Sequence, residues 1–202
     1  MDKGFIDIHT HHEKPGVTSP GMAGVHPWDA EKSPMLPDFA DCGIIGETGL
    51  DYAADVDRDA QERVFRAHLE AAEMMRKPVV LHVVRSFEPV MKILSEYRTY
   101  GVVFHGFTGS VQQAKRAFDA GYYLSFGERT LRSAKSREVI TFAPAHLIFC
   151  ETDDNPDIDI DIDIDIEEIY KEVASLRGTT VEELRKQTAD NYRKLMRHDS
   201  LA

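Results

Sequence analysis

Short apolar runs alternate with amphipathic stretches along most of the chain. The first run is Phe5–Ile8, in which Asp7 is the only polar residue, and the last is Leu147–Cys150. Between them, stretches such as Asp59–Arg76 carry apolar residues at helical spacing. Strands that alternate with helices are typical of a parallel sheet with helices outside it. The pattern therefore predicts an α/β fold.

The predicted elements follow one another in a regular order. Strands are expected at residues 5–8, 22–25, 44–45, 79–84, 102–104, 122–126 and 147–150. Helices are expected at residues 59–76, 86–97, 110–120 and 136–142, then from 166 and from 180. Ser110 is a predicted N-cap, and Thr180 with Glu183 predicts a capping box. Seven strands suit a (β/α) barrel, with an open doubly wound sheet as the alternative.

Composition limits the class of protein. Apolar residues make up 42% and charged residues 29% of 202, as in a soluble globular protein. No apolar run approaches the ~20 residues that would span a membrane. Cys42 and Cys150 each lie beside apolar residues, which predicts buried thiols in a cytoplasmic protein without a disulfide. We expect a single domain over residues 1–202.

The net charge of −11 comes from one segment. Residues 151–168 hold ten acids and no base, and the rest of the chain is close to neutral. Five consecutive Asp-Ile pairs, residues 157–166, form the centre of this segment. They fit an edge strand with one isoleucine face, a rim that collects cations, or a low-complexity spacer.

Chemistry-bearing side chains gather where the predicted strands end. They are His9, His11, His26, Glu47, His82, His105 and Asp153. Residues two apart in an extended chain point to the same side, so His9 and His11 can bind one cation. A (β/α) barrel carries its active site at the carboxyl ends of its strands, which favours the barrel over the open sheet.

Four imidazoles and two carboxylates are enough ligands for two divalent cations, of which Zn, Mn and Mg are candidates. We expect one cation on His9, His11 and Asp153 and a second on His82 and His105, with Glu47 as the bridge. Asp153 is also the expected acceptor of a proton from a metal-activated water, so Asp153 and Glu47 are the catalytic candidates. The predicted reaction is hydrolysis.

Other polar and aromatic residues allow more than one interpretation. His26 is expected to contact the substrate rather than a metal. Arg85 either clamps a phosphate or pairs with an acid. Trp28 and Tyr52 either stack on a base or close the core. His68, on a predicted helix, is expected to be a packing residue.

The ligand motifs stand in an order that resembles a known family. They are Asp7-x-His9-x-His11, Val25-His26-Pro27, Gly46-Glu47-x-Gly49-Leu50-Asp51-Tyr52, Lys77-Pro78-Val79-Val80-Leu81-His82-x-x-Arg85, His105-x-Phe107-Thr108-Gly109 and Glu151-Thr152-Asp153. Together they resemble the TatD-type metal-dependent hydrolases of the amidohydrolase superfamily. The resemblance implies a TIM-type barrel, a two-metal site on the residues above, and phosphodiester hydrolysis as a deoxyribonuclease or 3′–5′ exonuclease.

The chain departs from that family in the segment after His11. Only fourteen residues separate His11 from His26, too few for the helix–strand–helix that the resemblance implies there. We therefore expect a trimmed or distorted barrel of about seven strands, in which residues 14–22 cross the gap without a full helix.

A phosphodiesterase or nuclease is the favoured function. The alternatives are a hydrolase of C–N or C–O bonds in a small molecule and a metal-binding protein without catalysis. Proteins that bind long DNA do so with a basic groove, whereas residues 151–168 of this chain are acidic. The expected substrates are therefore DNA ends, short oligonucleotides or small phosphodiesters.

Overall fold

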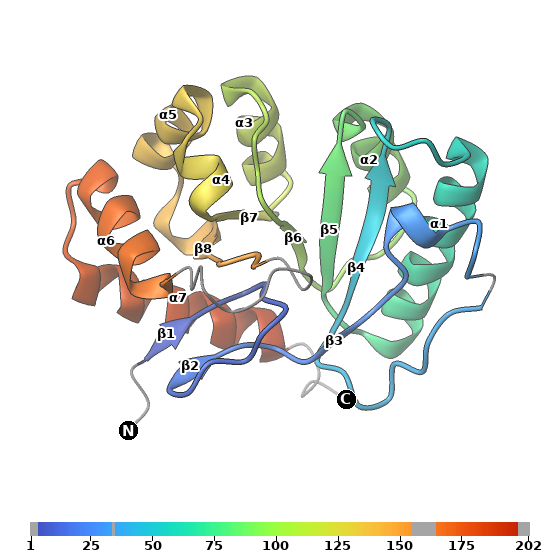
Figure 1. Ribbon diagram of the computed structural model, residues 1–202, viewed down its shortest axis with the longest axis horizontal. Helices are drawn as coiled ribbons and strands as arrows, with labels where there is room; N and C mark the ends of the chain where they lie inside the picture. The colour runs from blue at the N-terminus through green and yellow to red at the C-terminus, as the bar shows by residue number, and fades with distance from the viewer. Residues whose placement is uncertain (1–3, 34, 155–164, 198–202) are drawn as a thin grey trace. The chain divides into compact units, whose positions relative to one another are not determined.

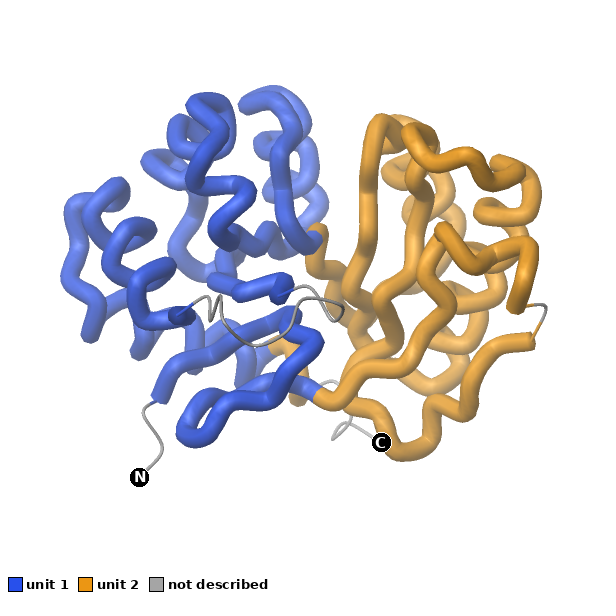
Figure 2. The backbone as a smooth tube through the Cα atoms, in the orientation of Figure 1, with its two compact units in different colours: residues 1–20, 105–194 blue, residues 21–104, 195–202 orange. Residues whose placement is uncertain are grey.

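The computed structural model describes residues 4–33, 35–154 and 165–197. The chain forms two compact units, one of residues 1–20 and 105–194 and the other of residues 21–104 and 195–202 (Figure 2). We call them unit 1 and unit 2. Most of the Asp-Ile repeat, residues 157–164, lies outside the described part of the chain.

Unit 2 is a parallel sheet with helices packed on it. Its strands lie in the order β3 (Met22–Ala23), β4 (Ile44–Asp51), β5 (Val79–Val84) and β6 (Val102–Phe104). Its helices are η1 (Pro27–Asp29), α1 (Arg58–Met75) and α2 (Phe87–Leu94). In Figure 1, α1 packs on β4 and α2 on β5. Residues such as Ile44, Val80 and Phe65 are fully buried in this core.

A bulge interrupts the pairing of β4 with β5. Ile45 pairs with Val79, but Thr48 already pairs with Leu81, so β4 holds one extra residue between these pairs. Bulges of this kind redirect a side chain and bend the strand. Glu47 lies in the bulge, and the strand then continues to Asp51.

Unit 1 holds two pairs of parallel strands and most of the remaining helices. The strands are β1 (Phe5–Ile6), β2 (Val17–Thr18), β7 (Tyr123–Phe126) and β8 (Ile148–Cys150), paired β1 with β2 and β7 with β8. The helices are α3 (Val111–Asp119), α4 (Glu128–Leu131), α5 (Ala134–Phe142), η2 (Ala145–Leu147) and α6 (Ile166–Arg177). The last helix is α7 (Val181–Met196), of which the residues up to Lys194 belong to unit 1.

Buried polar contacts hold α6 and α7 to the strands of unit 1. The Tyr170 hydroxyl accepts from Ile6 N and lies 2.8 Å from Thr188 Oγ1. Asn191 donates to the carbonyls of Ala145 and Ile148, at 2.9 Å each. Both side chains are fully buried, so these hydrogen bonds satisfy backbone groups that water cannot reach.

The α/β class with parallel strands is confirmed, and most elements lie where the sequence predicts them. Ser110 forms a capping box with Gln113, and Thr180 exchanges hydrogen bonds with Glu183. Residues 14–22 contain no helix, as expected. The two-residue strand β2 and the one-turn helix α4 are additions, and β4 runs to Asp51 rather than ending at Ile45. The single domain over residues 1–202 stays a prediction.

Among the described helices, none has the length and hydrophobicity needed to cross a membrane. Cys42 and Cys150 are both buried free thiols, which confirms the prediction for them.

Candidate metal centre

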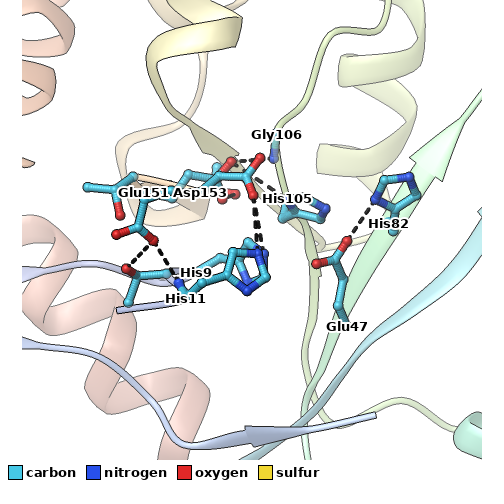
Figure 3. A network of polar contacts seen from close by, with 12 residues as sticks. His9, His11, Glu47, His82, His105, Gly106, Glu151 and Asp153 are labelled. Atoms are coloured by element: carbon cyan, nitrogen blue, oxygen red, sulfur yellow. Dashed lines mark hydrogen bonds and ion pairs between the residues drawn. The ribbon is translucent and has the colours of Figure 1, made fainter. Parts of the chain in front are cut away.

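Unit 1 gathers His9, His105 and Asp153, whose nitrogen and oxygen donors lie within 4.8 Å of one another. Asp153 Oδ1 lies 3.5 Å from His9 Nε2 and 3.8 Å from His11 Nε2 (Figure 3). The rings of His9 and His105 are 4.5 Å apart between centroids. The structure therefore brings together four of the predicted ligands in this unit, at the ends of three strands.

Asp154 organises the loop that carries His9 and His11. Its carboxylate accepts hydrogen bonds from His11 N at 2.7 Å and Thr10 Oγ1 at 2.8 Å. Burial raises the pKa of Asp154, but hydrogen bonds from Thr10, His11 and His12 outweigh burial and hold the pKa below its usual range. Asp154 is therefore an anion that fixes the loop. Asp154 was not predicted as a functional residue, although it directly follows Asp153.

Two further buried carboxyl groups lie behind this cluster. Glu151 accepts from Gly106 N at 2.6 Å and Ser125 Oγ at 2.5 Å, and lies 3.8 Å from His105 Nδ1. Asp7 accepts from Thr152 N and Thr152 Oγ1. Burial raises the pKa of Asp7 to about 7. These groups connect the strand ends that carry the candidate ligands.

Unit 2 gathers a second set, His26, Glu47 and His82, with donor atoms again within 4.8 Å of one another. We call it the Glu47 cluster. Glu47 Oε1 lies 2.7 Å from His82 Nδ1 and 3.1 Å from His26 Nε2. The sequence predicts His26 as a substrate contact, whereas this geometry makes it equally a candidate ligand. Its role stays a proposal.

Asp51 supports the Glu47 cluster from behind. Its Oδ2 lies 3.2 Å from His82 Nε2 and accepts a 2.7 Å hydrogen bond from Trp28 Nε1. Burial raises the pKa of Asp51, but hydrogen bonds from Trp28, Ala53 and His82 outweigh burial and lower the pKa below its usual value. When His82 donates to Asp51 through Nε2, its Nδ1 lone pair faces the Glu47 carboxylate. His82 Nδ1 and the Glu47 carboxylate would then be two ligands of one cation, with Asp51 accepting from the other ring nitrogen as in carboxylate–histidine–metal arrangements.

The donor sets of both units fit divalent metals. Each offers two or more imidazole nitrogens and one carboxylate oxygen, the ligand types that zinc and manganese accept. The sequence-based assignment placed His105 on the second cation with His82, whereas the structure groups its donor atom with those of His9 and Asp153, so we propose it as a ligand in unit 1. The role of Glu47 as a bridge stays a prediction.

The remaining predicted residues have distinct environments. Arg85 is exposed at the end of β5, with a left-handed backbone at φ 53°, and its substrate role stays a prediction. His68 is fully buried, with Nε2 accepting from Val25 N and Nδ1 facing the Val64 carbonyl at 2.7 Å. The prediction that His68 is a packing residue is therefore confirmed.

Several known proteins similar in sequence to this chain are named as hydrolases or nucleases. The chain is 30% identical over 195 residues to the "Uncharacterized metal-dependent hydrolase YcfH" of Escherichia coli (strain K12), covering 88% of this chain and 73% of that protein. It is 33% identical over 147 residues to the "3'-5' ssDNA/RNA exonuclease TatD" of Salmonella typhimurium, covering 65% and 56%. A relative from Vairimorpha ceranae is matched over 50% of its length. The chain thus spans from half to about three quarters of these relatives.

Solved structures show the same fold. The YJJV TatD homolog of Escherichia coli superposes with a TM-score of 0.76 over 96% of this chain and 98% of that chain, at 23% identity. A TatD family hydrolase from Entamoeba histolytica superposes with a TM-score of 0.74 over 89% and 75%, at 16% identity. The expected fold, of the TIM-barrel-like kind found in TatD proteins, is confirmed.

The model of the family described as "TatD related DNase" matches residues 6–197. This range includes every candidate ligand in both units. The chain therefore belongs to the TatD related DNase family, whose members include metal-dependent hydrolases.

Proposed function

We propose that this chain is a divalent-metal-dependent phosphodiesterase that acts on the ends of nucleic acids or on short oligonucleotides. The observation that carries the proposal is the gathering of imidazole and carboxylate donors within each unit, just after strands in unit 1 and on or just after strands in unit 2. Metal-dependent hydrolases and a 3′–5′ exonuclease among the relatives support the same class of reaction.

A divalent cation, when bound, supplies Lewis-acid stabilisation of phosphoryl charge and lowers the pKa of a nearby water. His9, His11, His105 and Asp153 would hold it in unit 1, and His26, Glu47 and His82 in unit 2. The two supporting carboxylates, Asp51 and Asp154, orient His82 and the His9–His11 loop.

Asp153 is the proposed proton acceptor. Its side chain is 23% exposed, so it meets solvent as well as His9 and His11. Its amide donates to the His9 carbonyl at 3.1 Å, which fixes its backbone at the end of β8. Oδ2 of this carboxylate can take a proton from an attacking water while Oδ1 faces the two imidazoles.

The charge distribution of the chain favours small substrates or the ends of nucleic acids. The surplus of acids lies in residues 151–168, and the rest of the chain carries nearly equal numbers of acids and bases. A protein that binds long DNA neutralises many phosphates with lysine and arginine. We propose that Arg85, exposed beyond β5, pairs with a single substrate phosphate.

A panel of substrates tests the proposal. Protein freed of metal with a chelator and reloaded with Zn²⁺, Mn²⁺ or Mg²⁺ is assayed on bis(p-nitrophenyl) phosphate, p-nitrophenyl phosphate, an anilide, a lactone and end-labelled single-stranded DNA. We expect metal-dependent hydrolysis of the diester and stepwise shortening of the DNA. Hydrolysis of the anilide or lactone but of neither phosphodiester would instead identify a C–N or C–O hydrolase.

Two carboxylate variants serve as the matched pair for this panel. Asp153→Asn should lower the rate on the diester by roughly 10²- to 10⁴-fold, the usual contribution of a general base. Asp119→Asn, at the exposed end of α3, should leave the rate unchanged. Metal content is measured in both, so that loss of a ligand is separated from loss of a proton acceptor.

A further inference from the structure

Trp28 is the only tryptophan of the chain, and 55% of it is exposed. It lies in η1, directly after Pro27 and two residues after His26. A tryptophan that closes a core buries most of its surface, so this exposure excludes the packing role that the sequence left open. The ring presents apolar surface to solvent instead.

A hydrogen bond fixes the orientation of that exposed ring. The indole Nε1 donates to Asp51 Oδ2 at 2.7 Å, and Asp51 is only 4% exposed. The ring therefore has one anchored polar edge and an apolar body with exposed surface, the arrangement by which tryptophan serves recognition surfaces. Ordering the ring in advance reduces the entropy that a ligand loses on binding.

The same ring lies against the Glu47 cluster. Its centroid is 4.6 Å from that of His26 and 5.9 Å from that of His82, both edge to face. Asp51, which anchors the indole, also contacts His82 Nε2 at 3.2 Å. A phosphate held at this cluster would thus have a fixed aromatic surface beside it.

Tyr52 shows the contrast within the same unit. It is only partly exposed, and the Arg58 guanidinium lies over its ring, 4.3 Å from the centroid. That ring face is already engaged in a cation–π contact. Of the two aromatic residues that the sequence offered for base stacking, the geometry favours Trp28.

We propose that Trp28 is a stacking surface for the nucleobase next to the phosphate that the Glu47 cluster binds. This inference rests on the proposed function. It narrows the expected substrates from phosphodiesters in general to phosphodiesters in which one sugar joins the reacting phosphate to a nucleobase. Stacking accepts every base because each has a π-face, so selection for base-bearing substrates without sequence preference is expected.

The kinetic test compares two diesters that differ in the base. Thymidine 5′-(p-nitrophenyl phosphate) carries one, and methyl p-nitrophenyl phosphate does not. We expect Trp28→Leu to lower kcat/KM for the first about tenfold more than for the second, the effect of one base stacked on an aromatic ring. Trp28→Phe loses the donor to Asp51 but keeps an aromatic face, so it should retain most of the preference. Tyr52→Leu is the aromatic control and should leave the preference unchanged.

A binding test uses the fluorescence of the single tryptophan. Thymidine 5′-monophosphate, added to the metal-loaded protein, should quench it saturably, whereas 2-deoxyribose 5-phosphate should bind without quenching. The inference would be overturned if wild type and Trp28→Leu had the same ratio of kcat/KM for the thymidine diester to that for the methyl diester. It would also be overturned if the nucleotide did not quench the fluorescence. If wild type hydrolyses neither diester, the proposed function fails, and the quenching experiment alone decides whether Trp28 stacks on a base.

Discussion

His82 Nδ1 lies 2.7 Å from Glu47 Oε1, although the strand pairing sets His82 opposite Gly49. The extra residue in β4 explains the difference, because the bulge moves Glu47 out of regular register. On its other side, His82 Nε2 faces Asp51. One imidazole is therefore fixed between two carboxylates, and only one of them was predicted from the sequence as a functional residue.

Asp51→Asn should weaken metal binding without unfolding the protein. The amide keeps the shape of the side chain but removes its negative charge. In the wild type the Asp51 carboxylate orients His82 and accepts the hydrogen bond from Trp28. Loss of such a supporting group typically costs about 10- to 100-fold in metal affinity. The affinity for Zn²⁺ is measured by competition with a chromophoric chelator. Asp55→Asn, an exposed position four residues along, is the control, and equal affinities in the two variants would show that Asp51 does not support the cluster.

Gly49→Ala should destabilise unit 2. A Cβ on Gly49 would lie 2.1 Å from the His82 carbonyl oxygen, and the backbone has φ +140°, which residues with side chains rarely adopt. We expect the free energy of unfolding to fall by about 2 kcal/mol or more, from overpacking together with backbone strain. Gly21→Ala is the control, because nothing lies within 4 Å of its added Cβ. Urea titrations that give equal stabilities for the two variants would contradict this close approach.

His68 should make stability depend on pH. Burial lowers its pKa from 6.5, so the unfolded chain takes up a proton more readily than the folded protein does. The free energy of unfolding should therefore fall as the pH drops below about 6.5, and His68→Gln should show a smaller fall. Urea titrations between about pH 7.5 and pH 5.5 measure the difference. Equal slopes in wild type and His68→Gln would contradict the assignment.

The acidic repeat should weaken binding of long nucleic acid. We expect replacement of Asp157, Asp159, Asp161, Asp163 and Asp165 by Asn to lower the KM for single-stranded DNA more than the KM for a small diester. The reason is repulsion between these carboxylates and a chain of phosphates, and the gain should shrink as salt is added. Asp165 caps α6, and asparagine preserves such a cap. If both substrates respond alike, or neither does, the repeat is a spacer.

Much of the fold could be predicted because its signals are local. Ser110 and Thr180 mark helix starts through their own capping hydrogen bonds, and His82 lies within an otherwise apolar strand. The two-residue strand β2 gave no such signal, since its pairing with β1 depends on contacts distant in sequence. The glycines around Glu47 were interpreted as a strand end, whereas the chain forms a bulge and continues to Asp51.

The candidate ligands were also predictable, but their supports were not. His9 and Asp153 carry recognisable chemistry shortly after strands, and His82 carries it within one. The roles of Asp51 and Asp154 were recognised only from their distances to His82 and His11 in the structure. The spacing of these residues along the sequence does not give such distances. The exposure of Trp28 likewise decided between two roles that the sequence left equal.

The most direct test of the account is the metal content of three proteins, measured by elemental analysis alongside phosphodiesterase activity. We expect wild type to bind about two divalent cations per chain and to lose activity when a chelator removes them. His82→Ala and Glu47→Gln should each lose mainly one cation, the one of the Glu47 cluster, since both residues are proposed ligands there. Wild-type activity that survives without bound metal would contradict the proposed chemistry, and full metal content in Glu47→Gln would contradict its role as a ligand.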